Sequence, residues 1–139
     1  MSESFVFHYE LDTFALSNES QYVNWLSKLC KQHQLKPECI NYIFADDEYI
    51  LNINKEYLDH DYYTDIITFP ISEEPLCVDI FISVDRVNDN AKQYEVDPST
   101  ELKRVMAHGI LHIAGFKDKE EADIKEMRKQ EELAIKLFK

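Results

Sequence analysis

Two histidines four residues apart, followed closely by a glycine, constrain this chain more than any other feature of its sequence. His108 and His112 stand in an apolar segment, and residues four apart in an α-helix lie on the same face. Gly115 follows three residues after the second histidine, where a glycine in a left-handed conformation can end a helix and reverse the chain. The segment therefore predicts a helix over residues 99–114 that presents both imidazole rings on one side.

Asp118 stands three residues beyond the glycine, so a reversed chain could return its carboxylate toward the two rings. Two nitrogen ligands and one oxygen ligand, with a fourth position open, are typical of catalytic zinc. We therefore expect His108, His112 and Asp118 to hold one Zn²⁺ ion. Two simpler interpretations stay open. A His-x-x-x-His pair alone is commonly an ordinary part of a helix surface or core, and Asp118 with Glu121 also matches the capping box of a following helix.

The rest of the chain alternates between the apolar spacing of strands and that of helices. Only 2 glycines and 4 prolines occur in 139 residues, and 45% of the residues are hydrophobic, which favours a compact ordered fold. The length fits one domain over residues 1–139. The expected order is β-α-β-α-β-β-α-α-α, an α+β domain in which a small mixed four-stranded sheet packs against about five helices. Strands are predicted over residues 4–12, 39–45, 64–70 and 77–83, and helices over residues 18–33, 46–57, 84–94, 99–114 and 119–138.

Pro70 is expected to end the third strand, because proline cannot donate to a strand ladder. Residues 71–76 then form the turn into the fourth strand, the hairpin partner of the third. Asn18 and Asp46 are expected to cap the first two helices with their side chains.

Charge and cysteine content narrow the classes of function. The net charge of −12 argues against a nucleic-acid partner, but local fields matter more than the sum. Residues 1–98 carry 6 Lys and Arg against 19 Asp and Glu, whereas residues 99–139 carry 9 against 8, so any basic footprint lies on the C-terminal helices. Cys30, Cys39 and Cys77 are scattered and are predicted to be buried thiols rather than disulfide or zinc-site cysteines. Without an apolar run of membrane-spanning length or a signal peptide, we expect a cytoplasmic protein with no membrane partner.

Asp65 and Asp79 each interrupt a predicted strand of β-branched or apolar residues, where aspartate is disfavoured. A strand end or a solvated strand face would explain either residue alone. Two such residues in adjacent strands favour a functional role, in which the carboxylates approach the histidines and orient a ligand or act as a general base. We therefore name Asp65 and Asp79 as candidate catalytic residues.

The histidine segment resembles the zincin pattern His-Glu-x-x-His-x-x-Gly-x-x-His, with two differences. Gly109 occupies the position of the catalytic glutamate, and Asp118 replaces the third histidine. Without that glutamate, peptide hydrolysis by the usual route lacks its base. Phosphodiester cleavage remains open, since a metal ion can activate water and positive groups can stabilise the charge that develops on the phosphate.

Three segments in the same order resemble the YbeY family of metal-dependent endoribonucleases and rRNA maturation factors. The resemblance covers most of the chain from about residue 50 to residue 131. The family signature His-Gly-x-Leu-His-x-x-Gly-(Tyr/Phe) is matched by residues 108–116, the Thr-Asp-Val-Leu-Ser-Phe-Pro strand by residues 64–70, the Gly-Asp-Ile-x-Ile-Ser strand by residues 78–83, and the later Met and Glu positions by Met127 and Glu131.

The resemblance implies a zinc-dependent, single-strand-specific endoribonuclease that acts in 16S rRNA 3′-end maturation and in ribosome quality control. Its expected partners are ribosomal RNA and the small ribosomal subunit, and a monomer is assumed. The alternatives are a non-catalytic assembly factor that uses zinc to brace its fold, and a metal-dependent hydrolase of another substrate.

Two differences from the family bear on activity. The third metal ligand is usually histidine rather than Asp118. An arginine usually follows an aromatic residue before the Thr-Asp strand, whereas Leu58 follows Tyr57 here. That arginine is suited to contact RNA phosphate, so Arg86, Arg104 or nearby lysines would have to replace it.

Overall fold

A computed structural model describes residues 4–138 of the chain. Within that range the elements follow the predicted order, and the expected α+β fold with four strands and five helices is confirmed. The elements are β1 (Phe5–Tyr9), α1 (Glu19–Gln32), β2 (Pro37–Ala45), α2 (Asp47–Leu58), β3 (Ile66–Glu73), β4 (Leu76–Ser83), α3 (Val84–Tyr94), α4 (Pro98–Ile113) and α5 (Glu121–Lys136).

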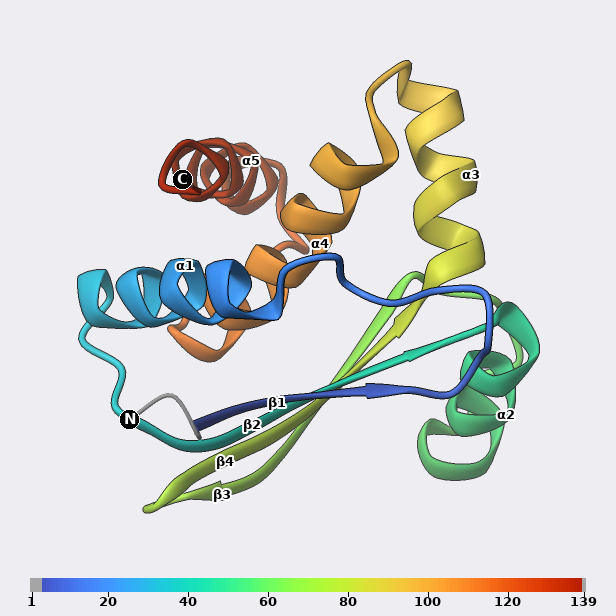
Figure 1. Cartoon of the computed structure of the whole chain (residues 1–139), viewed down its shortest axis with the longest axis horizontal. Coiled ribbons are helices and arrows are strands. Elements are labelled where there is room, and N and C mark those ends of the chain that lie inside the picture. The colour runs from blue at the N-terminus through green and yellow to red at the C-terminus, as the bar shows by residue number, and fades with distance from the viewer. Residues whose placement is uncertain (1–3, 139) are drawn as a thin grey trace.

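The four strands form one mixed sheet in the order β1-β2-β4-β3. β1, β2 and β4 run parallel, while β3 is the antiparallel hairpin partner of β4 and an edge of the sheet. Helices α1, α4 and α5 lie over one face, and α2 lies at one end of the sheet against the other face (Figure 1). The main core fills the space between the sheet and the overlying helices, where Ile40, Tyr42, Ile80 and Ile82 are fully buried.

Helix α4 lies directly on the strands. The hydroxyl of Tyr42 donates a buried hydrogen bond of 2.8 Å to the carbonyl of Met106. A Cβ atom at Gly109 would lie 3.1 Å from Cδ1 of Ile80 and 3.3 Å from Cδ1 of Ile66. Glycine therefore permits the close approach of α4 to the sheet. A glutamate at this position would point into the packed core rather than toward a metal site, which explains by packing why the zincin glutamate is absent.

The end of α4 has the conformation that the glycine predicts. Gly115 has a φ of +110°. Its N–H donates to the carbonyl of His112 over 3.1 Å, and the N–H of Phe116 donates to the carbonyl of Leu111 over 3.0 Å. These two bonds form a Schellman motif, which satisfies the last carbonyls of the helix and turns the chain back.

The predicted N-terminal caps are also present. The side chain of Asn18 accepts from the N–H of Gln21, and that of Asp46 accepts from the N–H of Tyr49. In contrast, α5 begins at Glu121 after the N-cap residue Glu120. The interpretation of Asp118 as the cap of this helix is therefore wrong.

The prediction that Pro70 ends the third strand is wrong. β3 continues to Glu73, and its register with β4 shifts between Pro70 and Ser72. At such an irregularity on an edge strand, a residue without an N–H disturbs little of the ladder. The turn predicted over residues 71–76 is correspondingly shorter.

The structure also shows the environment of the three cysteines and the character of the helices. Cys30 is buried as predicted, but Cys39 and Cys77 are partly exposed, and all three are free thiols. None of the helices within residues 4–138 combines the length and apolar character that a membrane span requires.

Replacing Gly115 by alanine is expected to lower the free energy of unfolding by about 1–2 kcal/mol, because a side chain at a φ of +110° strains the backbone. The added methyl group would meet no atom within 4 Å, so strain rather than a clash would be the cause. Urea denaturation measures the change. Lys117→Ala, an exposed position in the same turn, is the control and is expected to change stability by less than about 0.5 kcal/mol. Equal stability of Gly115→Ala and wild type would contradict the assigned turn.

Candidate active site

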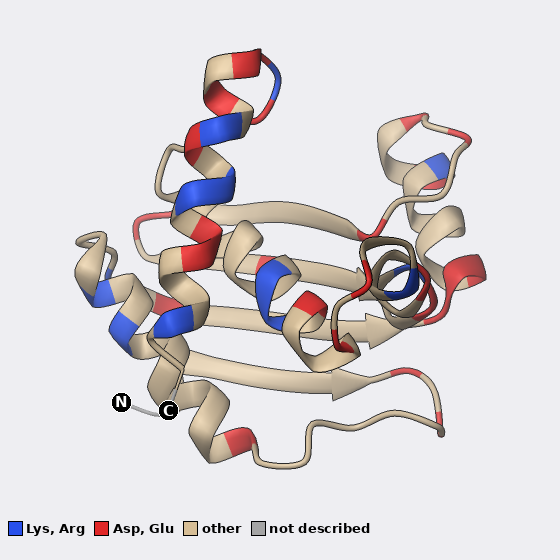
Figure 2. Ribbon diagram, turned by 90° about the horizontal axis from the view of Figure 1, so that it is seen from above, with Lys and Arg blue, Asp and Glu red and all other residues tan. Residues whose placement is uncertain are grey.

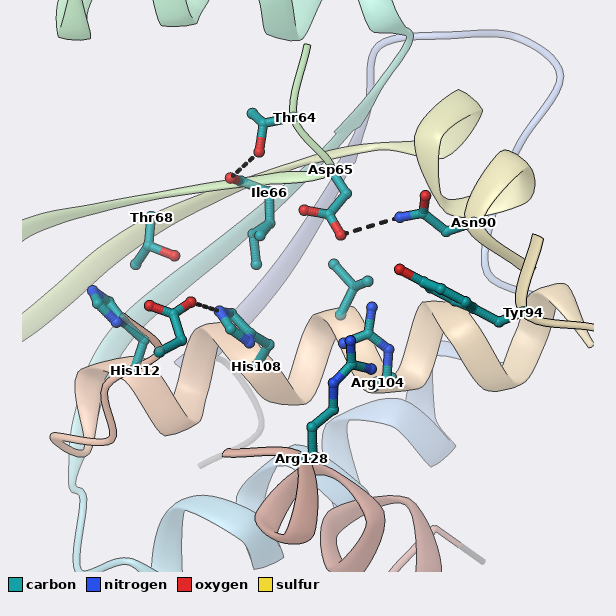
Figure 3. Close-up of a pocket in the computed structure, with 12 residues that line it drawn as sticks. Thr64, Asp65, Ile66, Thr68, Asn90, Tyr94, Arg104, His108, His112 and Arg128 are labelled. Carbon is teal, nitrogen blue, oxygen red and sulfur yellow. Dashed lines mark hydrogen bonds and ion pairs between the residues drawn. The ribbon is translucent and has the colours of Figure 1, made fainter. Parts of the chain in front are cut away.

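A pocket of about 400 Å³ lies between the start of edge strand β3 and helices α3, α4 and α5. His108 and His112 line it from α4, one helical turn apart, and Asp65 lines it from the residue before β3 (Figure 3). Asp118 lines it from the turn that follows Gly115. The structure thus brings together four of the five predicted site residues.

Asp79 is the predicted site residue that the structure places elsewhere. Its neighbours Val78 and Ile80 are buried beneath the helices, and because side chains alternate along a strand, Asp79 faces the opposite side of the sheet. There its carboxylate accepts a hydrogen bond of 3.0 Å from Asn41 and borders a separate pocket beside α2. The prediction that Asp79 approaches the histidines is therefore wrong.

The two nitrogens of the His108 ring meet different carboxylates. Nδ1 lies 2.7 Å from Oε2 of Glu131, and Nε2 lies 3.3 Å from Oδ2 of Asp118. A proton on Nδ1, donated to Glu131, leaves Nε2 as the lone-pair nitrogen that faces the pocket. This arrangement is common for histidines that bind metals, since the outer carboxylate fixes the tautomer and the ring orientation.

The donor types fit zinc, although the side chains do not enclose an ion in this conformation. Two imidazoles and one carboxylate are suitable ligands for Zn²⁺. Nowhere in residues 4–138, however, are three His, Cys, Asp or Glu side chains arranged to hold one ion. His112 and Asp118 are exposed, so their side chains can change rotamer without disturbing the core. Metal binding by His108, His112 and Asp118 therefore stays a prediction.

A network of charged side chains that includes two buried glutamates holds the His108 ring. Glu101 is 2% exposed and Glu131 is 1% exposed. Arg104 joins them: its Nε donates to Glu101 over 2.9 Å, and its Nη1 donates to Glu131 over 3.0 Å. Glu131 uses its second oxygen for His108. The sequence resemblance drew attention to Glu131 without a role, and its contact with His108 supplies one.

The charged side chains of this network shift one another's pKa values. Burial alone would lower the pKa of His108, but the hydrogen bond and charge of Glu131 outweigh burial and raise it. Burial would raise the pKa of Glu131, but its bond to His108 and the charge of Arg104 lower it instead. Glu131 is thus ionised at neutral pH and serves as a fixed acceptor for the Nδ1 proton.

Asp65 has a less strongly paired environment. Its Oδ2 accepts a long hydrogen bond of 3.4 Å from Asn90. Burial raises the pKa of the Asp65 carboxyl above its ordinary value, while the charges of Arg104 and His108 partly oppose the increase. A carboxylate with a raised pKa in a polar pocket is suited to proton transfer, because a general base works best when its pKa approaches the ambient pH.

The arginines around the pocket differ from those expected. Nη2 of Arg86 lies 2.9 Å from Oδ2 of Asp47, and Arg86 does not line the pocket. Arg104 lines it but is already bound to two glutamates. The second arginine of the pocket, Arg128 of α5, was not predicted, because its sequence context is that of any charged residue on an exposed helix face. Leu58 ends α2 and lies outside the pocket.

The chain is similar to a set of known proteins along nearly its whole length. It matches the family model described as Endoribonuclease YbeY over residues 8–139. A protein of that name from Flavobacterium johnsoniae is 49% identical over 133 residues, which cover 95% of each chain. Another from Cytophaga hutchinsonii is 43% identical over 142 residues, which cover 100% of this chain and 99% of the relative. The solution structure of a Thermotoga maritima protein has the same fold, with a TM-score of 0.66 and 24% identity over 96% of this chain and 89% of that one.

Glu131→Ala is expected to lower the free energy of unfolding by about 3 kcal/mol, because it removes the buried carboxylate that pairs with Arg104 and leaves a cavity. Urea denaturation measures the loss. Glu132→Ala removes the same side chain from the exposed neighbouring position, and its effect is expected to stay below about 0.5 kcal/mol. If the two variants were equally stable, the buried charges would not contribute as their geometry indicates.

Proposed function

The chain belongs to the endoribonuclease YbeY family, and from this premise we propose that it is a zinc-dependent endoribonuclease that cuts single-stranded RNA. The proposed substrate is small-subunit ribosomal RNA, including the 3′ end of 16S rRNA, in the cytoplasm, with roles in rRNA maturation and ribosome quality control. The observation that carries the proposal is the pocket lined together by His108, His112, Asp118 and Asp65.

His108, His112 and Asp118 are the residues that would hold one zinc ion. When bound, zinc supplies Lewis acidity, which makes water more acidic and stabilises negative charge on a phosphate. Glu131 holds the His108 ring so that Nε2 faces the pocket. Asp65 lines the same pocket from the start of β3 and would accept the proton of the attacking water.

Positive charge for the phosphate comes from the helices. Leu58 leaves the family's arginine position without charge. Arg104 and Arg128 line the pocket from α4 and α5 and can stabilise the charge that develops on phosphorus (Figure 3). Both guanidinium groups are suited to phosphate oxygens, although Arg104 is partly neutralised by its glutamates.

A non-catalytic assembly factor is the second candidate, and Leu58 is the observation that favours it. Such a protein would bind the small ribosomal subunit and leave RNA uncut. A peptidase is less well supported, because the tight packing around Gly109 leaves no room for the glutamate that peptide hydrolysis uses.

RNA cleavage is expected to be lost when zinc is removed from the protein, and equally when the zinc ligand His112 is removed. The purified protein is expected to contain close to one zinc per chain by elemental analysis, and His112→Ala should bind zinc at least tenfold more weakly and lose most cleavage of single-stranded RNA. His8→Ala, an exposed histidine on β1, is the matched control and should retain both properties. Equal cleavage by His112→Ala and wild type would discard the mechanism, whereas a metal-replete wild type that binds small subunits without cutting RNA would establish the second candidate.

Asp65→Asn is expected to reduce kcat for RNA cleavage by about 10²–10⁴-fold, because the amide cannot accept a proton. Zinc content and thermal stability should change little, since the side chain keeps its shape and its neighbours. Asp79→Asn on the opposite face of the sheet is the control and should keep kcat within about twofold. A similar loss of kcat in both variants would remove Asp65 from the mechanism.

A further inference from the structure

We propose that Tyr94 and Arg128 form a nucleotide subsite beside the candidate active site, in which Arg128 binds an RNA phosphate and the Tyr94 ring stacks on the adjacent base. This inference rests on the proposed function, because it states where the single strand is held during cleavage. Both residues line the pocket that contains His108, Tyr94 from the end of α3 and Arg128 from α5 (Figure 3).

Arg128 is the pocket arginine whose charge is available to a ligand. Arg104 is bound to Glu101 and Glu131, which together carry more negative charge than it can neutralise. Arg128 is exposed, and across residues 4–138 it forms no ion pair with a carboxylate oxygen within 4.0 Å. An unpaired guanidinium in a polar pocket favours a phosphate, which it can bind through two parallel hydrogen bonds.

Tyr94 adds the flat surface that a base requires. Its side chain is 49% exposed although it borders the pocket, so the ring is not part of the core. Cζ of Arg128 lies 5.9 Å from the centroid of the ring, within the range of a cation–π contact. This contact holds residues from two helices next to each other. An exposed aromatic ring beside a free cation is the combination by which proteins hold single strands, since every base has a face that can stack.

The position of Tyr94 and Arg128 relative to the two histidines determines which nucleotide of the RNA they would bind. Figure 3 shows Tyr94 and Arg128 toward one end of the pocket, with His108 and then His112 toward the other. A phosphate at the histidines therefore leaves a neighbouring nucleotide on the side of Tyr94. Arg128 would also supply the phosphate contact that the chain lacks at Leu58.

Variants of the full-length protein test the subsite by two measurements. The first is the fluorescence anisotropy of a labelled 12-nucleotide single-stranded RNA, with a chelator present to stop cleavage. The second is kcat and KM for cleavage of the same RNA by the zinc-loaded protein. Arg128→Gln and Tyr94→Leu are each expected to weaken binding about tenfold and to raise KM. Tyr94→Leu should keep kcat within about twofold, whereas Arg128→Gln should also lower kcat, because Arg128 contributes to stabilising the charge that develops on the phosphate. Tyr94→Phe keeps the stacking face and should bind as wild type does. Arg128→Gln should also reduce the slope of log affinity against log salt by about 0.7.

Matched controls separate the subsite from general charge and aromatic content. Lys129→Gln removes one exposed positive charge from the residue next to Arg128 on α5, and Tyr57→Leu removes an exposed tyrosine from α2, which lies against the other face of the sheet. Both are expected to change RNA affinity by less than about twofold. Tyr94→Leu and Arg128→Gln variants that match these controls would overturn the subsite.

A scan with single abasic nucleotides locates the stacked base. Wild type is expected to lose about tenfold in affinity when one position next to the cleaved bond lacks its base, and Tyr94→Leu should be insensitive at that position. A flat scan with wild type overturns the stacking role. If wild type neither binds nor cleaves RNA, the proposed function fails and the subsite with it. If wild type binds and cleaves while the variants match their controls, only the subsite fails.

Discussion

One arginine held between two buried glutamates sets the geometry of the whole site. Arg104 joins Glu101 of its own helix to Glu131 of α5, and the two carboxylates can stay buried there only because Arg104 pairs with both. The second oxygen of Glu131 holds Nδ1 of His108. The interaction that joins α4 to α5 therefore also orients the imidazole, so that stability and ring position depend on the same carboxylate. Even if apolar residues in place of these charged ones stabilised the fold, the His108 ring would lose the carboxylate that accepts its hydrogen bond.

The only two glycines of the chain both lie in the histidine segment. One permits close packing of α4 on the sheet, and the other permits the turn that ends α4. Gly109 lets α4 approach Ile66 and Ile80 closely, which places the start of β3, and with it Asp65, beside the histidine face of the helix. Gly115 ends the helix with a φ of +110° and turns the chain so that Asp118 returns to within 3.3 Å of His108. Without the first glycine the sheet would stand farther away, and without the second the chain would not reverse at this point.

The features that could be predicted from the sequence are those that depend on local chain geometry. The spacing of His108 and His112 fixes a shared helix face, and the position of Gly115 fixes the end of that helix. Asp79 could not be placed in this way, because its face of the sheet depends on strand register, and a shift of one residue reverses it. Arg128 lies outside every sequence motif and reaches the pocket only through the packing of α5 on α4. The fold was therefore more predictable than the site, whose parts converge through contacts between distant segments.

An acidic protein can bind RNA if its positively charged side chains lie where the RNA passes. In the described residues, 4–138, Lys and Arg lie on the helices and loops and none lies in a strand (Figure 2). Charges farther than about 8 Å from a phosphate are largely screened at physiological salt, so the excess of acidic residues over residues 1–98 weakens binding at the pocket less than the net charge of −12 suggests. The same excess repels RNA from most of the remaining surface. For the RNA substrate proposed above, Arg104 and Arg128 offer positive charge over a short stretch at the pocket, which suits a few unpaired nucleotides rather than a wrapped duplex.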